Sequence, residues 1–449
     1  MRSSLKTLAM DPWALPVFIV GMLGVAFPRW MAVLVPALLL AGVVRSWRGM
    51  PEDNFNRLLG APGEAGFRAL CALVMFGLWA LLSTFWSSAP STSATKALFL
   101  LLMLVCIFGF TLWRNHETPD ALDRAAQGLL AAFSLASVLM AIEVQTNQGL
   151  SRGLMTLLPF LQDDPKHLRL DKGVVVGRTE NEINRRTAVL AFLVWPVLLA
   201  AVRIWWPAKG KAALAAFSGT TATVFGRLGW LPVAVAMLAA GIAIMLGGHQ
   251  SSQTALLAGI AAFALAKLWP RAAVLGAAAA WTVLVLLIVP IVMLAHANRL
   301  HEAPWLFGSA RHRVVIWNHT VERIALKPMV GIGADATPAA RPQNVDGYDR
   351  KEGGYYVSTG RHAHNAYLQV WYELGLIGAL LFLAAGLALI SLIASLPAAV
   401  IPWALAQAAT TAIMAASSYS IWQVWFQASM AAGVAALMLA AVVANRRPD

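Results

Sequence analysis

Long apolar runs follow one another along most of this chain, and shorter polar stretches separate them. A helix needs about 20 apolar residues to cross the hydrocarbon core of a bilayer, and most of these runs reach or approach that length. Within lipid, only helices and closed barrels satisfy their own backbone hydrogen bonds, and continuous apolar runs are typical of helices. The pattern therefore predicts an all-α polytopic membrane protein with about twelve transmembrane helices. The predicted spans are residues 12–27, 29–44, 68–86, 96–113, 125–144, 187–206, 229–247, 253–268, 272–296, 366–395, 398–417 and 421–444.

Two long polar segments interrupt this alternation, at residues 145–186 and 297–365. The second segment separates the ninth predicted span from the tenth. We therefore expect three parts in the chain. A transmembrane bundle over residues 1–296 includes the polar segment 145–186, a large loop covers 297–365, and a second transmembrane part covers 366–449.

The large loop has a pattern of its own. Between Arg311 and Leu326, apolar residues recur at helical spacing, which predicts an amphipathic helix. Pro328 ends that helix because proline lacks an amide hydrogen, and Gly331-Ile-Gly333 predicts a turn. The stretch from there to Gly360 is rich in Gly, Pro and Asp, so we expect a mobile lid over the outer mouth of the bundle.

Composition supports the membrane assignment and excludes other classes. Hydrophobic residues make up 59% of the chain and charged residues 12%, whereas a soluble domain has about 25% charged residues. The net charge of +13 would indicate nucleic-acid binding in a soluble protein, but here the basic residues are scattered between apolar spans. Cys71 and Cys106 both lie inside apolar runs, which predicts buried thiols rather than a disulfide or a metal pair.

The distribution of basic residues predicts the orientation. If the N-terminus is cytoplasmic, the short cytoplasmic connections carry nearly all the arginines and lysines of the short loops, and the short outer connections hold only Arg29 and Lys96. Both termini are therefore expected in the cytoplasm, and the two long segments are expected outside. The apolar run after Pro12 lacks a small-residue cleavage site, so it is predicted to be the first span rather than a signal peptide.

Arginines near the outer surface indicate an anionic ligand. Basic residues outnumber acidic ones in the two outer segments, and Arg185 and Arg186 stand where the sixth predicted span begins. Guanidinium groups beside hydrocarbon are costly unless they meet water, lipid headgroups or a bound anion, and phosphate matches their paired donors. Arg311 and Arg313 on the amphipathic helix are placed to reach the same anion, and Arg361 lies close to the histidines discussed next. Anchoring to lipid headgroups is the alternative.

Two histidines stand where the large loop meets the tenth predicted span, in the run His362-Ala-His364-Asn365. An imidazole titrates near pH 6.5, so it can take up a proton at neutral pH. His364 is the candidate base, and His362, Asn365 and Tyr367 are secondary candidates. The alternative is that His364 or Asn365 only caps the helix that follows.

A zinc site is a further alternative, with His362 and His364 joined by another histidine of the loop. The remaining partners for that site are His301, His312 and His319. His-x-His is a weak metal signal and no carboxylate-rich motif accompanies it, so no metal and no other cofactor is assigned. A polar cluster of His249, Gln250 and Gln253 lies at another outer connection, where it either lines the site or stabilises the turn.

Several of these residues form an ordered set of motifs. Arg313-Val-Val-Ile-Trp317, then Pro328-x-x-Gly331-x-Gly333, then His364-Asn365 followed by Gly375, resemble the Wzy/O-antigen ligase superfamily. The run Arg186-Thr-Ala-Val-Leu190 resembles the Arg-x3-Leu element of lipopolysaccharide O-antigen ligases, and the order of spans and loops is similar over nearly the whole chain. One departure is Gly375-Leu-Ile-Gly378, because ligases often have a threonine at its last position.

The resemblance implies a metal-independent, inverting glycosyltransferase of the bacterial inner membrane. Such an enzyme moves O-antigen polysaccharide from undecaprenyl pyrophosphate to the lipid A-core oligosaccharide at the periplasmic face. His364 would be its base, and the arginines at positions 185, 186, 311, 313 and 361 would bind the pyrophosphate. An O-antigen polymerase and a protein O-oligosaccharyltransferase remain open within the superfamily. A transporter of polyprenyl-linked glycan is also open, although its charges should lie at mid-membrane.

Overall fold

The computed structural model describes most of the chain. The described residues are 13–47, 63–158, 168–171, 174–205, 231–340, 351–357 and 360–446. Part of the predicted mobile lid, residues 341–350 with 358 and 359, lies outside them.

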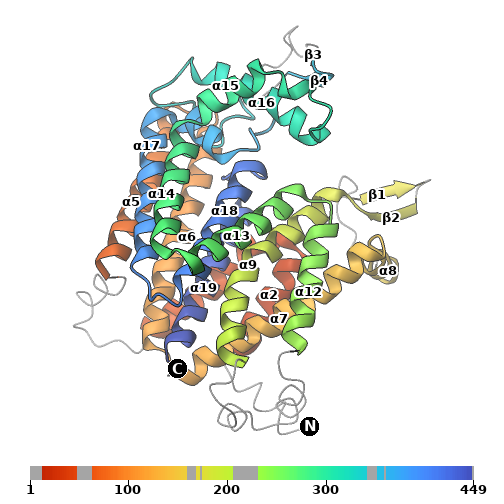
Figure 1. The fold of residues 1–449 in the computed structure, drawn as a ribbon, viewed down its shortest axis with the longest axis vertical. Helices are drawn as coiled ribbons and strands as arrows, with labels where there is room; N and C mark the ends of the chain where they lie inside the picture. Colours follow the sequence, from red (N-terminus) through yellow and green to blue (C-terminus); the bar gives the residue numbers. More distant parts are fainter. Residues whose placement is uncertain are drawn as a thin grey trace.

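Helices make up almost all of the described structure (Figure 1). The helices of the first half are α2 (Ala14–Ala26), α3 (Met31–Trp47), α5 (Gly63–Leu82), α6 (Pro90–His116), α7 (Pro119–Gln145), α8 (Gly149–Leu157) and α9 (Glu180–Trp205). Those of the second half are α12 (Leu231–Leu246), α13 (Gln250–Leu268), α14 (Pro270–Leu286), α15 (Ile288–Ala297), α16 (Gly308–Ile324), α17 (Ala366–Ala394), α18 (Ile401–Ser417) and α19 (Val424–Arg446). Short 3-10 helices include η1 (Pro28–Trp30), η3 (Ser83–Trp86) and η6 (Leu300–Glu302).

Strands form only two short antiparallel hairpins within the described residues. The first pairs β1 (Leu168–Asp171) with β2 (Val174–Arg178), and the second pairs β3 (Lys351–Glu352) with β4 (Tyr355–Tyr356). Both hairpins belong to the polar segments that the sequence places outside the bundle.

The all-α polytopic prediction is confirmed. Among the described residues, 8 helices are long and apolar enough to cross a membrane, or 9 if the bent pair α14 and α15 counts as one span. Each predicted apolar run contains a helix, but α2, α12 and α18 have fewer than 18 residues. The number of membrane crossings therefore stays a prediction.

One predicted span is not a single helix. The sequence predicts a continuous helix over residues 272–296, and this is wrong, because α14 and α15 bend by 67° at Leu287. Pro290 explains the break, since its ring clashes with the carbonyl four residues earlier and it has no amide hydrogen to donate. The bend carries α15 across the end of the bundle, where α15 and α16 form a separate layer (Figure 1).

Glu117 ties together one end of the bundle. Its carboxylate accepts hydrogen bonds from the indoles of Trp13 (3.1 Å) and Trp113 (3.0 Å) and from Nε of Arg45 (2.7 Å). All of these residues stand at connections that the sequence places on one side of the membrane. The N-terminal segment and two of the predicted cytoplasmic connections thus meet at a common end.

The opposite end gathers the connections predicted to lie outside. Arg29, which follows α2, pairs with Glu182 at the start of α9 at 2.7 Å. Ser309 of α16 donates a hydrogen bond to Gln250 of α13 at 2.8 Å, which ties the outer layer to the bundle. Each of these contacts joins two connections that the sequence predicts to lie outside.

α17 is broken near its outer end. The sequence predicts one unbroken helix over residues 366–395, but Gly375 has φ 67° and ψ −166°, far from helical values. The segment after α16 fills the break: Pro328 accepts a hydrogen bond from the amide of Leu376 (2.8 Å), and the amide of Gly333 donates to Glu373 (2.8 Å). Backbone groups freed by the break are satisfied in this way, as a membrane interior requires.

The side chain of Glu373 locks the same junction. It is fully buried and accepts hydrogen bonds from the amide of Asp335 (3.0 Å), from Thr337 and from Gln369. The indole of Trp422 completes the set of donors. The segment that contains Asp335 and Thr337 is therefore fixed to α17 by a buried network of hydrogen bonds to Glu373.

We expect Gly375→Ala to destabilise the fold by about 2–5 kcal/mol, from overpacking together with the left-handed backbone. A Cβ at this position would lie 2.4 Å from the backbone of Met329, and φ is 67°. Gly241→Ala in α12 is the matched control, because a Cβ there meets no atom within 4 Å. Thermal unfolding of the detergent-purified proteins measures both effects, and equal unfolding temperatures would contradict the proposed packing.

Candidate active site

The N-terminus of α17 fixes the position of the histidines. Asn365 is its N-cap, and its Oδ1 accepts hydrogen bonds from the amides of Tyr367 (3.0 Å) and Leu368 (3.1 Å). Tyr367 is fully buried and donates its hydroxyl to the carbonyl of Ala412 at 3.2 Å. These two secondary candidates thus have structural partners, and they hold the residue before the cap, His364, in place.

The loop that carries the histidines is also fixed from α16. The indole of Trp317 donates a hydrogen bond to the carbonyl of Ala363 at 2.8 Å. Trp317 is four residues after Arg313, so one helix positions both the arginine and the histidine loop. The motif Arg313-Val-Val-Ile-Trp317 therefore places Arg313 on the same helix as the indole that holds the histidine loop.

His364 has a defined tautomer. Its Nδ1 lies 2.8 Å from the carbonyl oxygen of Ser418, which can only accept, so Nδ1 carries the hydrogen and Nε2 keeps its lone pair. The ring of His362 lies 4.0 Å from that of His364, and Nδ1 of His362 accepts a hydrogen bond from the His364 amide at 3.1 Å. His364 is thus oriented as a proton acceptor, and His362 supports its backbone.

The environment keeps both imidazoles neutral. Burial lowers the pKa of His364 from its usual 6.5; the Ser418 carbonyl opposes the shift, and the charges of Arg313 and His312 add to it. Burial, with the charges of His364 and Arg313, lowers the pKa of His362 to about 3. A neutral His364 can accept a proton at neutral pH.

The backbone of His364 is strained. Its φ is 52°, in the left-handed region that costs a residue with a side chain about 1–2 kcal/mol. Such strain persists only where neighbouring contacts impose it, and it is concentrated at functional sites. Here the cap of α17 and the Trp317 hydrogen bond impose it.

The charge of Arg313 acts on both histidines of the site. Its charge lowers the pKa of His364 and His362, and also that of His312 and His249. Burial lowers the pKa of Arg313 itself, and no carboxylate of the described residues lies within ion-pair distance of it. A half-buried guanidinium without a carboxylate partner beside a neutral imidazole is suited to a bound anion.

Arg311 and Arg361 are placed differently. The guanidinium of Arg311 lies 6.0 Å from the ring centre of Tyr355, on the second hairpin, rather than against the histidines. Residues two apart on a helix do not share a face, so the structure separates Arg311 from Arg313. Arg361 is exposed next to His362.

Arg185, near the start of α9, contacts residues of α9 and α19. It pairs with Glu182, and its guanidinium lies 5.8 Å from the ring centre of Trp425. The charges of Arg185 and Arg313 both lower the pKa of Tyr419, although burial raises it overall. Tyr419 follows Ser418, whose carbonyl holds His364. Tyr419 therefore lies between the start of α9 and the histidines.

Arg186 lies deeper and has a carboxylate partner. It is 7% exposed, and its Nη1 lies 3.2 Å from both Glu143 Oε1 and Ser151 Oγ. Glu143 in α7 is 2% exposed. The sequence alternatives for Arg186 were a bound phosphate or a lipid headgroup, and neither included this buried ion pair.

Arg186→Gln should destabilise the protein by about 3–5 kcal/mol, because it leaves the Glu143 charge buried without a cation. The double variant Arg186→Gln, Glu143→Gln should recover most of that stability. If Arg186 binds pyrophosphate, the double variant stays inactive despite its restored unfolding temperature. Recovery of both stability and glycan transfer would instead make Arg186 a structural residue only.

The polar cluster that follows α12 stabilises its own turn and borders the histidines. His249 lies 2.6 Å from Ser252 and 3.3 Å from the hydroxyl of Ser418, and Gln253 donates to the carbonyl of Met245. Burial, with the charge of Arg313, lowers the pKa of His249 to about 4. The sequence left open whether His249 lines the site or only stabilises the turn, and it did not single out Ser418, which comes from a connection distant along the chain.

The histidines of the zinc alternative do not gather around His362 and His364 within the described residues. The ring of His312 stacks on Tyr355 at 5.1 Å, and His319 pairs with Glu322 at 3.3 Å. His301 lies against His296. The hydrogen bonds of His362 and His364 instead involve the His364 amide and the Ser418 carbonyl.

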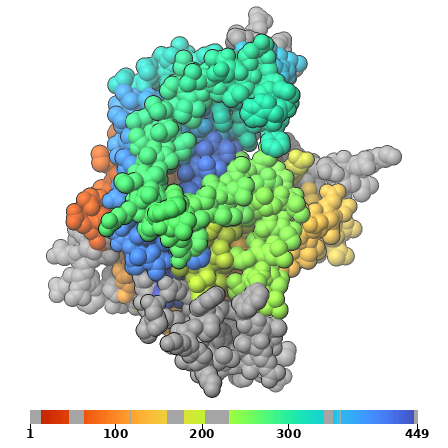
Figure 2. Space-filling model, in the orientation of Figure 1, coloured from red at the N-terminus to blue at the C-terminus, as the bar shows by residue number. Residues whose placement is uncertain are grey.

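Figure 2 shows the molecule hollowed between the layer of α15 and α16 and the bundle beneath it, and the blue C-terminal part of the chain is visible inside. Ser418, which holds His364, directly follows α18. A ligand of some size can therefore approach the end of the bundle from this face.

These features define a polytopic helical membrane protein with a neutral imidazole at one end, beside a guanidinium that has no carboxylate partner within the part of the chain that the structure describes. Residues 235–383, which include both groups, match the family described as "O-Antigen ligase". The chain is similar to the "Putative polysaccharide ligase" of Rickettsia felis, 30% identical over 127 residues, which are 27% of this chain and 30% of that protein. It is also similar to the "Putative polysaccharide ligase" of Rickettsia bellii, 37% identical over 75 residues, 17% of this chain and 18% of the relative.

The alignments thus span less than a third of the length of these relatives. Over residues 235–383 this chain is therefore similar to the O-antigen ligase family, and over part of its length to proteins described as polysaccharide ligases.

Proposed function

We propose that this protein is an O-antigen ligase. It would transfer O-antigen polysaccharide from undecaprenyl pyrophosphate to the lipid A-core oligosaccharide. The observation that carries the proposal is the pairing of His364, held neutral with Nε2 as acceptor, with Arg313, which has no carboxylate partner among the described residues. One group takes a proton and the other stabilises negative charge.

The transfer needs two events at the anomeric carbon. A hydroxyl of the acceptor sugar attacks this carbon while Nε2 of His364 removes its proton, and the bond to the pyrophosphate oxygen breaks. Negative charge then builds on the departing undecaprenyl pyrophosphate. Arg313 stabilises it, and one such donor is typically worth about 3 kcal/mol of barrier. Attack from the face opposite the leaving group inverts the anomeric carbon.

The other arginines have graded roles in this proposal. The charges of Arg185 and Arg313 both act on Tyr419. In this proposal Arg185 therefore binds the same anion as Arg313. Arg186 is held by Glu143 and contributes from deeper in the bundle. Arg311 lies over Tyr355 and Arg361 is exposed, so in this proposal both attract the anionic donor rather than contact its leaving oxygen.

The proposed orientation follows from the loops. Arg45 and the other residues around Glu117 lie at the end of the bundle away from the histidines. Basic short loops favour the cytoplasm, so the histidines would face the periplasm and both termini the cytoplasm. The donor and acceptor of an O-antigen ligase meet on that periplasmic side of the bacterial inner membrane.

The structure gives a reason to prefer a transferase to a transporter. A transporter places its charged binding groups in broken helices near mid-membrane. α17 is broken beside the buried Glu373, but donors from the protein itself surround that carboxylate. Arg313, which has no carboxylate partner among the described residues, lies on α16, outside the predicted spans.

The proposal is tested by the lipopolysaccharide of a strain that lacks this gene. Lipid A-core without attached polysaccharide is expected on a gel, and a plasmid copy of the gene should restore the ladder. Core carrying a single repeat would indicate a polymerase instead. A normal ladder would contradict both functions and favour transfer to a protein or transport.

The pH dependence of transfer should follow His364. Because burial lowers the pKa of His364 below 6.5, the base form prevails above that pH, and kcat/KM is expected to fall only as pH decreases below about 6.5. Unfolding curves at the same pH values separate loss of the base from loss of the fold. An acidic limb centred above pH 7 would contradict the assignment.

A further inference from the structure

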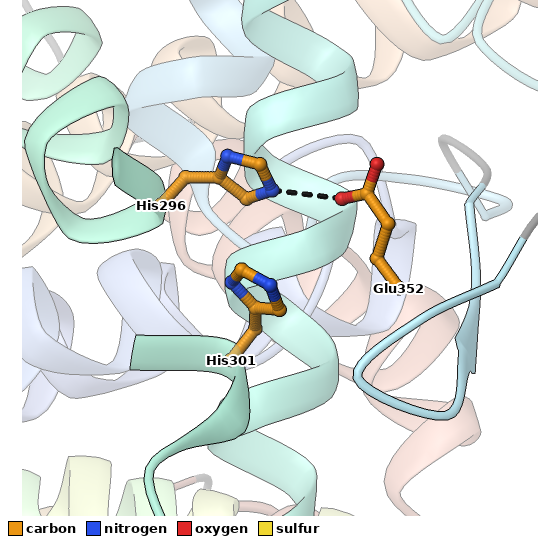
Figure 3. A group of neighbouring side chains, drawn as sticks. All are labelled: His296, His301 and Glu352. Atoms are coloured by element: carbon orange, nitrogen blue, oxygen red, sulfur yellow. Dashed lines mark hydrogen bonds and ion pairs between the residues drawn. The ribbon is translucent and has the colours of Figure 1, made fainter. Parts of the chain in front are cut away.

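Three side chains converge in the outer layer, away from the residues assigned to transfer. They are His296 at the end of α15, His301 in η6 and Glu352 in β3 (Figure 3). One ligand atom from each lies within 4.8 Å of the others, and Nε2 of His296 is 2.7 Å from Oε2 of Glu352. The two imidazole rings stack with centres 4.6 Å apart.

His301 gives the second observation. It is 6% exposed, and its Nδ1 is buried without a hydrogen-bond partner in the described part of the chain. Its Nε2 is 3.5 Å from Glu302, whose carboxylate is held at 2.6 Å by Arg299. A buried imidazole with an unsatisfied nitrogen is costly, and a ligand that uses a ring nitrogen would offset this.

The donor set selects the kind of ligand. Two imidazoles and one carboxylate suit a transition metal such as zinc, whereas magnesium and calcium prefer oxygen donors alone. Zinc commonly takes three protein ligands with water in the fourth position. Tetrahedral ligands about 2.0–2.1 Å from the ion lie about 3.3 Å apart, so small movements of these side chains suffice.

We propose that His296, His301 and Glu352 bind one Zn²⁺ ion. The ion would join the second hairpin to the end of α15. Tyr355 of this hairpin stacks on His312 and lies under Arg311, so a fixed hairpin also fixes the outer surface next to Arg313. The ion takes part in no step of glycan transfer, and its site shares no residue with the pair His364 and Arg313.

Zinc binding to the full-length protein in detergent tests this proposal without any glycan. Metal-stripped protein is dialysed against graded ZnCl2, bound zinc is measured by mass spectrometry, and thermal unfolding is followed with and without zinc. Wild-type protein should bind about one zinc per chain and unfold at a higher temperature with it. Glu352→Gln and His301→Gln should each weaken binding by at least about tenfold.

His319→Gln is the matched control, because His319 also pairs with a carboxylate, Glu322, but lies outside the group of three. It should bind zinc as wild type does. Variants are compared only if their unfolding temperature without zinc matches wild type, and His296→Gln replaces any that fails. Absence of stoichiometric zinc, or equal binding by wild type and the ligand variants, would overturn the proposal while leaving the transferase proposal intact.

Discussion

Replacing His364 with alanine is expected to lower the rate of glycan transfer by at least about a hundredfold, because positioned bases contribute about 10²–10⁴-fold. Nε2 is the acceptor that the Ser418 hydrogen bond leaves available, and His362 cannot substitute, since its Nδ1 already accepts from the backbone. The measurement is transfer by purified protein, together with the lipopolysaccharide ladder of cells. Retention of wild-type transfer would remove His364 from the mechanism.

Two controls separate loss of chemistry from loss of fold. His319→Ala removes an imidazole from α16 that pairs with Glu322, and transfer should be unchanged. His364→Gly should be inactive yet fold at least as stably as wild type, because glycine adopts the positive φ of 52° without strain. An inactive, stable glycine variant would show that the strain at this position is retained for function.

The sequence predicts the helices well because apolar length is a strong signal in lipid. It fails where a helix is interrupted without a change in hydropathy. Gly375 lies within a mostly apolar run, and only the inserted segment after Pro328 explains why its backbone departs from a helix. Pro290, by contrast, was a visible signal for the bend between α14 and α15.

For the site, the sequence identifies the groups with the chemistry but not their partners. His364 and Arg313 stand out through residue type and position. In the structure the charge of Arg313 lowers the pKa of His364. Ser418 comes from a distant connection and has no periodic or compositional signal, and local pattern alone leaves open whether the polar cluster with His249 lines the site. Glu143 lies within an apolar span, and its pairing with Arg186 depends on how α7 packs against α9. Long-range packing therefore supplies what local pattern cannot.

Arg313→Ala is expected to lower transfer by about 10²–10³-fold, the usual effect of removing one donor to a developing negative charge. Arg313→Lys should recover only part of this, because lysine keeps the charge but lacks the paired donors. The control is Arg323→Ala, which removes the same charge from the same helix about 15 Å away along its axis. Similar losses in both alanine variants would mean that general positive charge, rather than a specific anion contact, supports the reaction.

The same variant should also change the pH profile in a defined direction. The charge of Arg313 lowers the pKa of His364, so its removal lets that pKa rise towards 6.5. The acidic limb of kcat/KM should therefore move to higher pH in Arg313→Ala and stay in place in Arg323→Ala. A purely structural role for Arg313 would reduce activity at every pH without moving the limb. A shifted limb together with reduced transfer would thus tie the guanidinium to both the base and the leaving group.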